Sequence, residues 1–349
     1  MGDKYPIIKV AAVQADSIFL NREASIEKAC SIVKEAGKNG AKIIGFPESF
    51  IPGHPIWFHF HSSTDAISTH LSLELFNNSI EVPGVETETL CKAAKDANTY
   101  VVIGVCERTP NRLGTLFNTQ VFIGPDGHYI GKHQKLVPTL GERLVHTGGY
   151  GDTLKVFNTE FGPISGLICG ENCNPLAVFA LIAGGTRIHI SSWPNHFSKL
   201  SRPMRDRCVV NSQCFAEMSK ACVVSVCSTV SKNTIRKLQL KAEDKEFLRD
   251  PVNTGGTTII NADSKVIAGP MGNEEGILYA DIDLEVNVRL KLRHDYAGHY
   301  NRPDVFQLKV NRNVPKIFTY NSIIRNQTDD VDCSEETSQV IQDNIDLEF

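Results

Sequence analysis

The amino-acid sequence predicts an α/β fold in which mixed sheets and helices form a sandwich. Short β-branched, apolar segments alternate with longer segments of helical periodicity along most of the 349 residues. One pair of strands is joined by the Gly-Pro-Asp-Gly run at residues 124–127, which is a strong hairpin signal. Hairpins give antiparallel pairs and strand–helix–strand units give parallel pairs, so the mixture favours a sandwich over a purely parallel sheet.

The first half of the chain shows this alternation clearly. We expect an apolar strand at Ile7–Gln14, followed by a helix at Glu23–Ala36 that ends near Gly37, because glycine favours helix termini. Ala41–Phe46 is expected to be the next strand. The helix Val85–Ala97 then leads into further apolar runs, and the strands expected there are Tyr100–Val105, Phe117–Ile123 and Tyr129–Ile130.

The second half continues the pattern with short strands and two longer helices. The strands are expected at Ile164–Ile168, Arg187–Ser191 and Cys222–Val226, and the helices at Leu176–Ala183 and Met204–Lys220. No internal repeat and no long linker interrupts the chain, so we predict a single domain over residues 1–320.

The end of the chain differs in charge from the rest. The sequence has 36 basic and 40 acidic residues, which gives a net charge of −4. Eight of the acids follow Arg325, beyond which there is no Lys or Arg, so the rest of the chain carries +4. We therefore predict that residues 321–349 form an acidic tail that is flexible or used in assembly.

Composition argues against several classes of function. No basic block is present, so nucleic-acid binding is not expected. The sequence has no 18-residue apolar run and no apolar leader, so we expect neither membrane spanning nor secretion. Ten cysteines without a Cys-x-x-Cys pair indicate free thiols in a reducing cytoplasm.

No cofactor and no metal ion are expected. A group of histidines, His54, His59 and His61, could in principle hold a metal. These residues alternate with Phe58 and Phe60, however, and the recognised zinc spacings are absent. We therefore interpret the segment as an aromatic loop or strand.

Cys169 is the most informative single residue. It ends the apolar strand Ile164–Ile168 and is followed by Gly170, a layout that resembles a nucleophile elbow. A thiol attacks as the thiolate, and a nearby cation or helix N-terminus is expected to lower its pKa. The alternative is a buried cysteine that only packs as a small hydrophobe; packing is also the role expected for Cys173.

Two other strands end in residues that complement this thiol. Glu48 follows the strand Ala41–Phe46, and Lys135 lies beside a proline-bounded turn after Tyr129–Ile130. Ligands bind beyond the carboxyl ends of strands in open α/β sheets, so Glu48, Lys135 and Cys169 are expected to converge in one crevice. They would supply a general base, an oxyanion stabiliser and a nucleophile, although an exposed Glu or Lys alone is usually only solvated.

These residues and their neighbours resemble the nitrilase superfamily. The resemblance extends from about Ile7 to about Phe306, and Asp295–Asp304 is similar to the C-terminal stretch of true nitrilases and cyanide-degrading relatives. The chain departs from many nitrilases at Gly170, where they have tryptophan, which bears on the substrate range. The motifs that match, in order, are Gly45–Glu48, His133–Thr139, Pro138–Val145 with Glu142, and Cys169–Asn172.

The resemblance implies a four-layer αββα sandwich and a covalent hydrolysis of a nitrile to a carboxylic acid and ammonia. Cys169 would form the thioimidate and acyl-enzyme, Glu48 would act as base, and Lys135 would stabilise negative charge, while Glu142 positions Lys135 and the attacking water. Large rings and an amide near the crevice are candidates for substrate binding or, alternatively, for sealing the core or an oligomer contact. These are Trp57, Phe58, Asn172, Trp193 and Pro194.

Alternatives of the same superfamily remain open. The enzyme could act on cyanide, could stop at the amide, or could be an amidase or carbamoylase. A non-catalytic scaffold is disfavoured, because a scaffold has no physical need for this set of charges. The resemblance also implies a homo-oligomer, a dimer that builds into a larger spiral or helical filament, with a small aliphatic or arylaliphatic nitrile as substrate.

Overall fold

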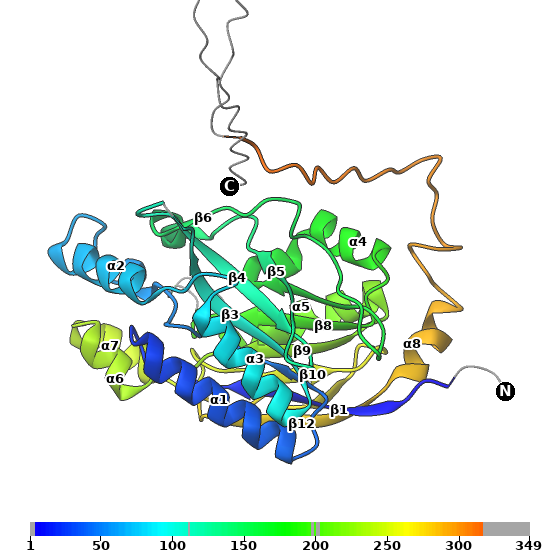
Figure 1. Ribbon diagram of the computed structural model, residues 1–349, viewed down its shortest axis with the longest axis horizontal. Helices are drawn as coiled ribbons and strands as arrows, with labels where there is room; N and C mark the ends of the chain where they lie inside the picture. Colours follow the sequence, from blue (N-terminus) through cyan, green and yellow to red (C-terminus); the bar gives the residue numbers. More distant parts are fainter. Residues whose placement is uncertain (1–3, 111, 197–198, 200–202, 317–349) are drawn as a thin grey trace, which may run out of the picture. The chain divides into compact units, whose positions relative to one another are not determined.

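Two β-sheets pack face to face, and helices cover both outer faces (Figure 1). The computed structural model describes residues 4–110, 112–196, 199 and 203–316. The chain up to Val314 forms one compact unit, and the predicted tail 321–349 lies outside the described residues. The predicted αββα sandwich is confirmed.

The first sheet mixes parallel and antiparallel pairs, with the order β12-β1-β2-β3-β4-β5 and β6 beside β4. β1 pairs parallel with β2 and antiparallel with β12, and the predicted hairpin joins β4 to β5. The bounds are β1 Ile7–Gln14, β2 Ile43–Gly45, β3 Tyr100–Arg108, β4 Leu116–Ile123, β5 Tyr129–Gln134, β6 His146–Thr147 and β12 Gly276–Asp283.

The second sheet has the order β11-β10-β9-β8-β7. Its β7, β8 and β9 run parallel, and β10 and β11 return antiparallel. The bounds are β7 Ile164–Ile168, β8 Ile188–Trp193, β9 Cys222–Cys227, β10 Thr258–Ile260 and β11 Val266–Ala268.

Alternating strand residues serve two different apolar layers, because successive side chains point to opposite faces. In β1, Val10 and Ala12 pack between the sheets, whereas Ala11 and Val13 pack under the helices. The layer between the sheets joins β1–β4 to β7–β10. Burial on both faces explains why β1, β3, β7 and β9 consist mainly of apolar residues.

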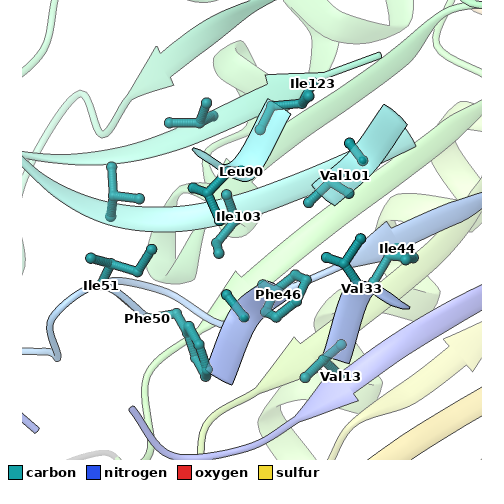
Figure 2. Close-up of a cluster of buried hydrophobic side chains, with 14 of the residues drawn as sticks. Val13, Val33, Ile44, Phe46, Phe50, Ile51, Leu90, Val101, Ile103 and Ile123 are labelled. Carbon is teal, nitrogen blue, oxygen red and sulfur yellow. The ribbon is translucent and has the colours of Figure 1, made fainter. Parts of the chain in front are cut away.

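The outer layers come from two pairs of helices. Helices α1 (Arg22–Lys38) and α3 (Val85–Ala97) lie side by side on the first sheet (Figure 1). Figure 2 shows Val33 and Leu90 of these helices against Ile44 and Ile103 of the sheet. Helices α4 (Pro175–Ala183) and α5 (Met204–Ser219) cover the second sheet.

The remaining helices surround this core. They are α2 Ala66–Asn78, α6 Lys232–Lys237, α7 Ala242–Arg249 and α8 Leu284–Lys291, with 3-10 turns at Ile56–His59, Leu140–Leu144 and Cys169–Cys173. The segment of alternating His and Phe is thus partly a 3-10 turn, where a loop or strand was expected. Among the described residues, no helix has the length and apolar character needed to cross a membrane.

Candidate active site

The carboxyl ends of strands from both sheets meet at one place. Glu48 follows β2, Lys135 follows β5 and Cys169 follows β7. The sheets are tied together here, since the Glu48 amide donates to the carbonyl of Trp193 at the end of β8 (3.2 Å). The three strand ends therefore meet between the two sheets, where the sequence predicts that these side chains converge.

Glu48 is a buried carboxylate with one free oxygen. It is 2% exposed, and its Oε1 accepts hydrogen bonds from Lys135 Nζ (2.8 Å) and Asn118 Nδ2 (2.6 Å). Its Oε2 is buried and has no hydrogen-bond partner among the described residues. Burial raises the pKa of Glu48 to about 7, although the Lys135 charge opposes the shift. The free oxygen can therefore take up and return a proton near neutral pH.

Lys135 is a buried ammonium held between two carboxylates. Its Nζ donates to Glu48 Oε1 and to Glu142 Oε2 (2.6 Å), and the side chain is 1% exposed. Burial lowers the pKa of Lys135, but the charges of Glu48 and Glu142 together raise it above its ordinary value. An ammonium has three protons, so one remains for a ligand in the site.

Glu142 is satisfied at both oxygens. Oε2 accepts from Lys135 and from the Thr139 amide (2.9 Å), and Oε1 accepts from Asn118 Nδ2 (2.7 Å) and His146 Nδ1 (3.1 Å). Burial works against its charge, yet Lys135 and His146 hold the pKa of Glu142 well below its usual range. Glu142 therefore stays ionised and fixes the charge on Lys135.

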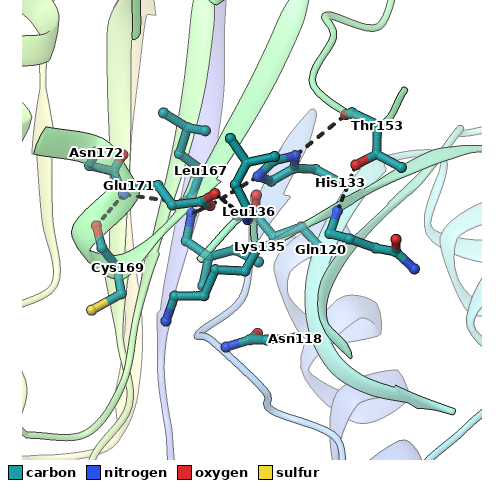
Figure 3. Close-up of polar contacts among 12 residues, drawn as sticks. Asn118, Gln120, His133, Lys135, Leu136, Thr153, Leu167, Cys169, Glu171 and Asn172 are labelled. Carbon is teal, nitrogen blue, oxygen red and sulfur yellow. Dashed lines mark hydrogen bonds and ion pairs between the residues drawn. The ribbon is translucent and has the colours of Figure 1, made fainter. Parts of the chain in front are cut away.

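Cys169 sits at a sharp turn, as the nucleophile-elbow pattern predicts. Its φ of 53° lies in the left-handed region, which costs a non-glycine residue about 1 kcal/mol or more. Asn172 Nδ2 holds this turn through the carbonyls of Cys169 (2.9 Å) and Leu167 (3.2 Å). In the view of Figure 3, the Lys135 side chain ends between the Cys169 sulfur and the Asn118 amide.

The expectation that a nearby cation lowers the thiol pKa is wrong, because the pKa of Cys169 is raised. Burial, and then the charge of Glu48, raise the pKa of Cys169 well above its ordinary value, and Lys135 opposes them only in part. Cys169 is 5% exposed, and its sulfur is close enough to Glu48, Lys135 and Glu142 for their charges to act on it. The resting state is therefore a neutral thiol beside a carboxylate that can accept its proton.

Sequence reasoning did not assign a role to Glu171, which joins two of the motifs. Its Oε1 accepts from the Leu136 amide (2.6 Å), and its Oε2 accepts from the Ile168 amide (3.1 Å) and bonds His133 Nε2 (2.9 Å). The lysine segment is thereby bound to the cysteine segment (Figure 3). The signal available in the sequence was the position of Glu171 within the cysteine motif, Cys169–Asn172.

Asn118, the second unassigned residue, bridges the carboxylates of Glu48 and Glu142. It lies in β4, where every residue is buried. Three consecutive polar residues, Asn118, Thr119 and Gln120, inside a buried strand were the signal that could have identified it, because buried polar groups need partners.

The candidate substrate residues occupy different environments. Trp57 and Trp193 are fully buried; Trp57 packs near Phe19, and Trp193 packs in a small cluster with Cys169. Pro194 is buried beside Trp193. Phe58 is half-buried and packs against Gly141, where an added Cβ would lie 2.7 Å from the Phe58 Cβ.

Asn172 has a structural task. Its Oδ1 accepts from Ser191 Oγ (2.8 Å) and bonds His189 Nε2 (2.9 Å), while its Nδ2 holds the cysteine turn. Both ends of the amide are thus engaged within the protein. We therefore reassign Asn172 from substrate binding to positioning of Cys169.

A possible cation-binding group lies within the same site. Ligand atoms of Glu48, His54 and Glu142 lie within 4.8 Å of one another. The ammonium of Lys135 already binds both carboxylates. It supplies the positive charge that a metal ion would otherwise bring there.

Comparison with known proteins places this site in a family. Residues 9–291 match the carbon-nitrogen hydrolase family model. A nitrilase of a Bacillus species is 34% identical over 89% of this chain and 90% of its own length. An aliphatic nitrilase of Rhodococcus rhodochrous is 34% identical over 87% of this chain and 82% of its own length.

The fold agrees with this assignment. A carbon-nitrogen hydrolase from Helicobacter pylori superposes with a TM-score of 0.66 at 15% identity, over 86% of this chain and 97% of that one. The family match covers the segments that carry Glu48, Lys135, Glu142 and Cys169. This chain belongs to the carbon-nitrogen hydrolase family, within the nitrilase superfamily.

Proposed function

We propose that the protein is a nitrilase that hydrolyses a nitrile to a carboxylic acid and ammonia, with Cys169 as the nucleophile. The observation that carries the proposal is the buried set of a neutral thiol, a carboxylate of pKa about 7 with a free oxygen, and an ammonium with one unused proton. The identity of about 34% to nitrilases supports nitriles as the substrate class.

In the first step the thiol proton moves to Glu48 as the sulfur attacks the nitrile carbon. A C–S bond forms, one π pair moves to the nitrogen, and the proton from Glu48 completes a neutral thioimidate. The Lys135 proton that neither carboxylate accepts donates to the nitrile nitrogen, where negative charge develops. Such a preorganised donor contributes on the order of 3–4 kcal/mol.

Two water molecules complete the reaction. The first adds to the thioimidate carbon, and expulsion of ammonia leaves a thioester on Cys169. The second hydrolyses the thioester and releases the acid. In both steps Glu48 takes a proton from water and passes it to the leaving atom, while Glu142 keeps Lys135 charged.

The space beside the nucleophile bears on substrate size. A Cβ on Gly170 would meet only Thr139 Oγ1, at 3.7 Å. Many nitrilases have tryptophan at this position, and its ring would occupy the space beside the nucleophile. Glycine leaves that space for the substrate. We propose a small aliphatic or arylaliphatic nitrile as substrate.

Replacing the nucleophile tests the proposal. Cys169→Ala should reduce turnover to less than about 1% of wild type, because losing a covalent nucleophile costs several orders of magnitude. The exposed Cys173 offers a matched control, and Cys173→Ala should keep full activity. Ammonia, acid and amide should be measured with nitriles, amides and cyanide. A Cys169→Ala enzyme that keeps a few per cent of the rate contradicts the nucleophile assignment, and a wild type active only on amides or cyanide contradicts the nitrile assignment.

We further propose a cytoplasmic homo-oligomer, a dimer that builds into a spiral, without nucleic-acid, membrane or cofactor partners. Free thiols at all described cysteines support a reducing compartment. Exposed apolar residues on neighbouring helices, Leu176 of α4 and Val210 and Met218 of α5, support a contact with a second copy.

A further inference from the structure

Three buried polar atoms around the catalytic carboxylates have no hydrogen-bond partner among the described residues. They are Glu48 Oε2, His54 Nδ1 and His146 Nε2. A buried polar atom without a partner costs about 1–3 kcal/mol, so such atoms are expected to bind water or substrate.

His54 is the member of this group that faces Glu48. Its Nδ1 lies 3.7 Å from Glu48 Oε1, which is too long for a direct hydrogen bond. A water molecule can bond both groups across such a span. Because Glu48 Oε1 already accepts from Lys135 and Asn118, the water proton has to go to the free Oε2.

His54 is neutral at physiological pH. Burial lowers its pKa to about 3, with the charge of Glu142 opposing the shift and that of Lys135 adding to it. A neutral imidazole can hydrogen-bond a water molecule without competing with Glu48 for the proton. His54 and Glu48 therefore form a contact between a neutral imidazole and a carboxylate that can accept a proton, and they do not form an ion pair.

The loop that carries His54 is fixed on both sides. The Pro52 carbonyl accepts from the Leu20 amide (2.9 Å), and the Gly53 carbonyl accepts from Cys106 Sγ (3.4 Å). Gly53 has a φ of 139°, and a Cβ there would lie 2.6 Å from the Phe19 ring. Only glycine fits this turn, so the position of His54 is set before substrate binds.

We propose that His54 is a positioning residue that holds the hydrolytic water against Glu48. The inference rests on the proposed Cys169 chemistry and adds a residue to its hydrolytic half. The water oxygen bonds to the thioimidate carbon as one proton moves to Glu48 Oε2 and the C=N π pair moves to nitrogen, which then takes that proton. A second transfer through Glu48, from the new hydroxyl to the nitrogen, expels ammonia and leaves the thioester.

The proposal predicts that loss of His54 slows the water steps more than the attack by sulfur. In His54→Leu, turnover should fall by roughly 10- to 100-fold, the range expected when a reactant is misplaced. The Cys169 adduct should then become the main species in intact-protein mass spectra of enzyme quenched during turnover. His54→Asn should restore much of the rate, since an asparagine amide reaches the position of Nδ1.

Two controls make the outcome decisive. His61 lies on the same segment and bonds the Leu238 carbonyl through Nε2 (2.7 Å), so His61→Gln should keep both rate and adduct level. Equal losses in His54→Leu and His54→Asn without adduct, at unchanged thermal midpoints, would overturn the positioning role. So would a wild-type rate in His54→Leu. Cys169→Ala, measured in parallel, separates the claims, because its continued turnover would overturn the nucleophile and the role of His54 together.

Discussion

Two glutamates that share one lysine have opposite pKa shifts. Burial raises the pKa of Glu48, whereas the pKa of Glu142 is held low despite burial. The difference follows from the donors: both oxygens of Glu142 accept hydrogen bonds, but Glu48 Oε2 accepts none among the described residues. Glu142 is therefore a permanent counter-charge to Lys135, and Glu48 is the carboxylate suited to the proton transfers that we propose.

The raised pKa of Glu48 predicts the pH dependence of the reaction. Glu48 must be ionised to accept the thiol proton, so activity is lost as pH falls through its pKa of about 7. Below that pH, kcat/KM should fall about tenfold per unit, because this parameter reports groups of the free enzyme. A profile measured from pH 5 to 9 that stays flat to about pH 5 would show that Glu48 has an ordinary pKa.

Asn118 offers a way to move this acid limb. Its hydrogen bond stabilises the ionised form of Glu48, so Asn118→Leu should raise the pKa of Glu48 and shift the limb of kcat/KM to higher pH. Gln120 is a matched control, because it is a buried amide of the same strand that bonds Ser192 and the Ile190 carbonyl. Gln120→Leu should leave the limb in place, and a shift of equal size in both variants would contradict the role of Asn118.

At the scale of the elements, strand β3 has to approach the Glu48 turn very closely. A Cβ on Gly104 would lie 2.3 Å from the Pro47 carbonyl oxygen and 2.6 Å from the Ser49 amide nitrogen. These are backbone atoms, which cannot rotate away as a flexible side chain can. Gly104 therefore sets the position of Glu48.

Gly104→Ala should displace the Glu48 turn and lower the free energy of unfolding by about 1–3 kcal/mol, as overpacking does, with a loss of activity. Gly276 of β12 provides the control, since its Cβ would meet only the flexible end of Met271, at 3.2 Å. Denaturant unfolding and kcat/KM of both variants check this prediction. A fully active Gly104→Ala would show that the close approach does not position Glu48.

The elements were predictable where local pattern decides structure. The bounds of β1 and α3 match the predictions, and α4 begins one residue early because Pro175 fits the first helical position after the Asn174 cap. The segment that forms β12 gave no such signal in the sequence. Most of its residues are only half-buried, so it lacks the continuous apolar pattern of a buried strand. It is a strand because it pairs with β1, a contact distant in sequence.

At the scale of the whole molecule, the site residues also divide into those that a local motif predicts and those that depend on contacts distant in sequence. Glu48, Lys135 and Cys169 could be found because each stands in a short motif at a strand end. The bridging role of Asn118 and the thiol pKa depend on burial and on neighbours from other elements, which local sequence does not contain. The prediction that Glu48, Lys135 and Cys169 converge required strand ends of both sheets to meet, and in the structure these three side chains lie together.

The proposed assembly can be tested on the helices of the second sheet. Val210 of α5 is 46% exposed, and a charge placed in an apolar contact is costly. Light scattering should give wild type a mass well above the 38.5 kDa of one chain, and Val210→Asp a smaller mass. A wild type that remains at one chain mass would contradict the oligomer.

The central claim is that a neutral thiol, a proton-accepting carboxylate and a fixed ammonium form a covalent intermediate in one buried site. Intact mass and peptide mapping of wild-type enzyme, quenched during turnover of a nitrile, test it most directly. We predict one added substrate-derived group, located on Cys169. Turnover without an adduct on any residue, or with the adduct on Cys173, would contradict the account.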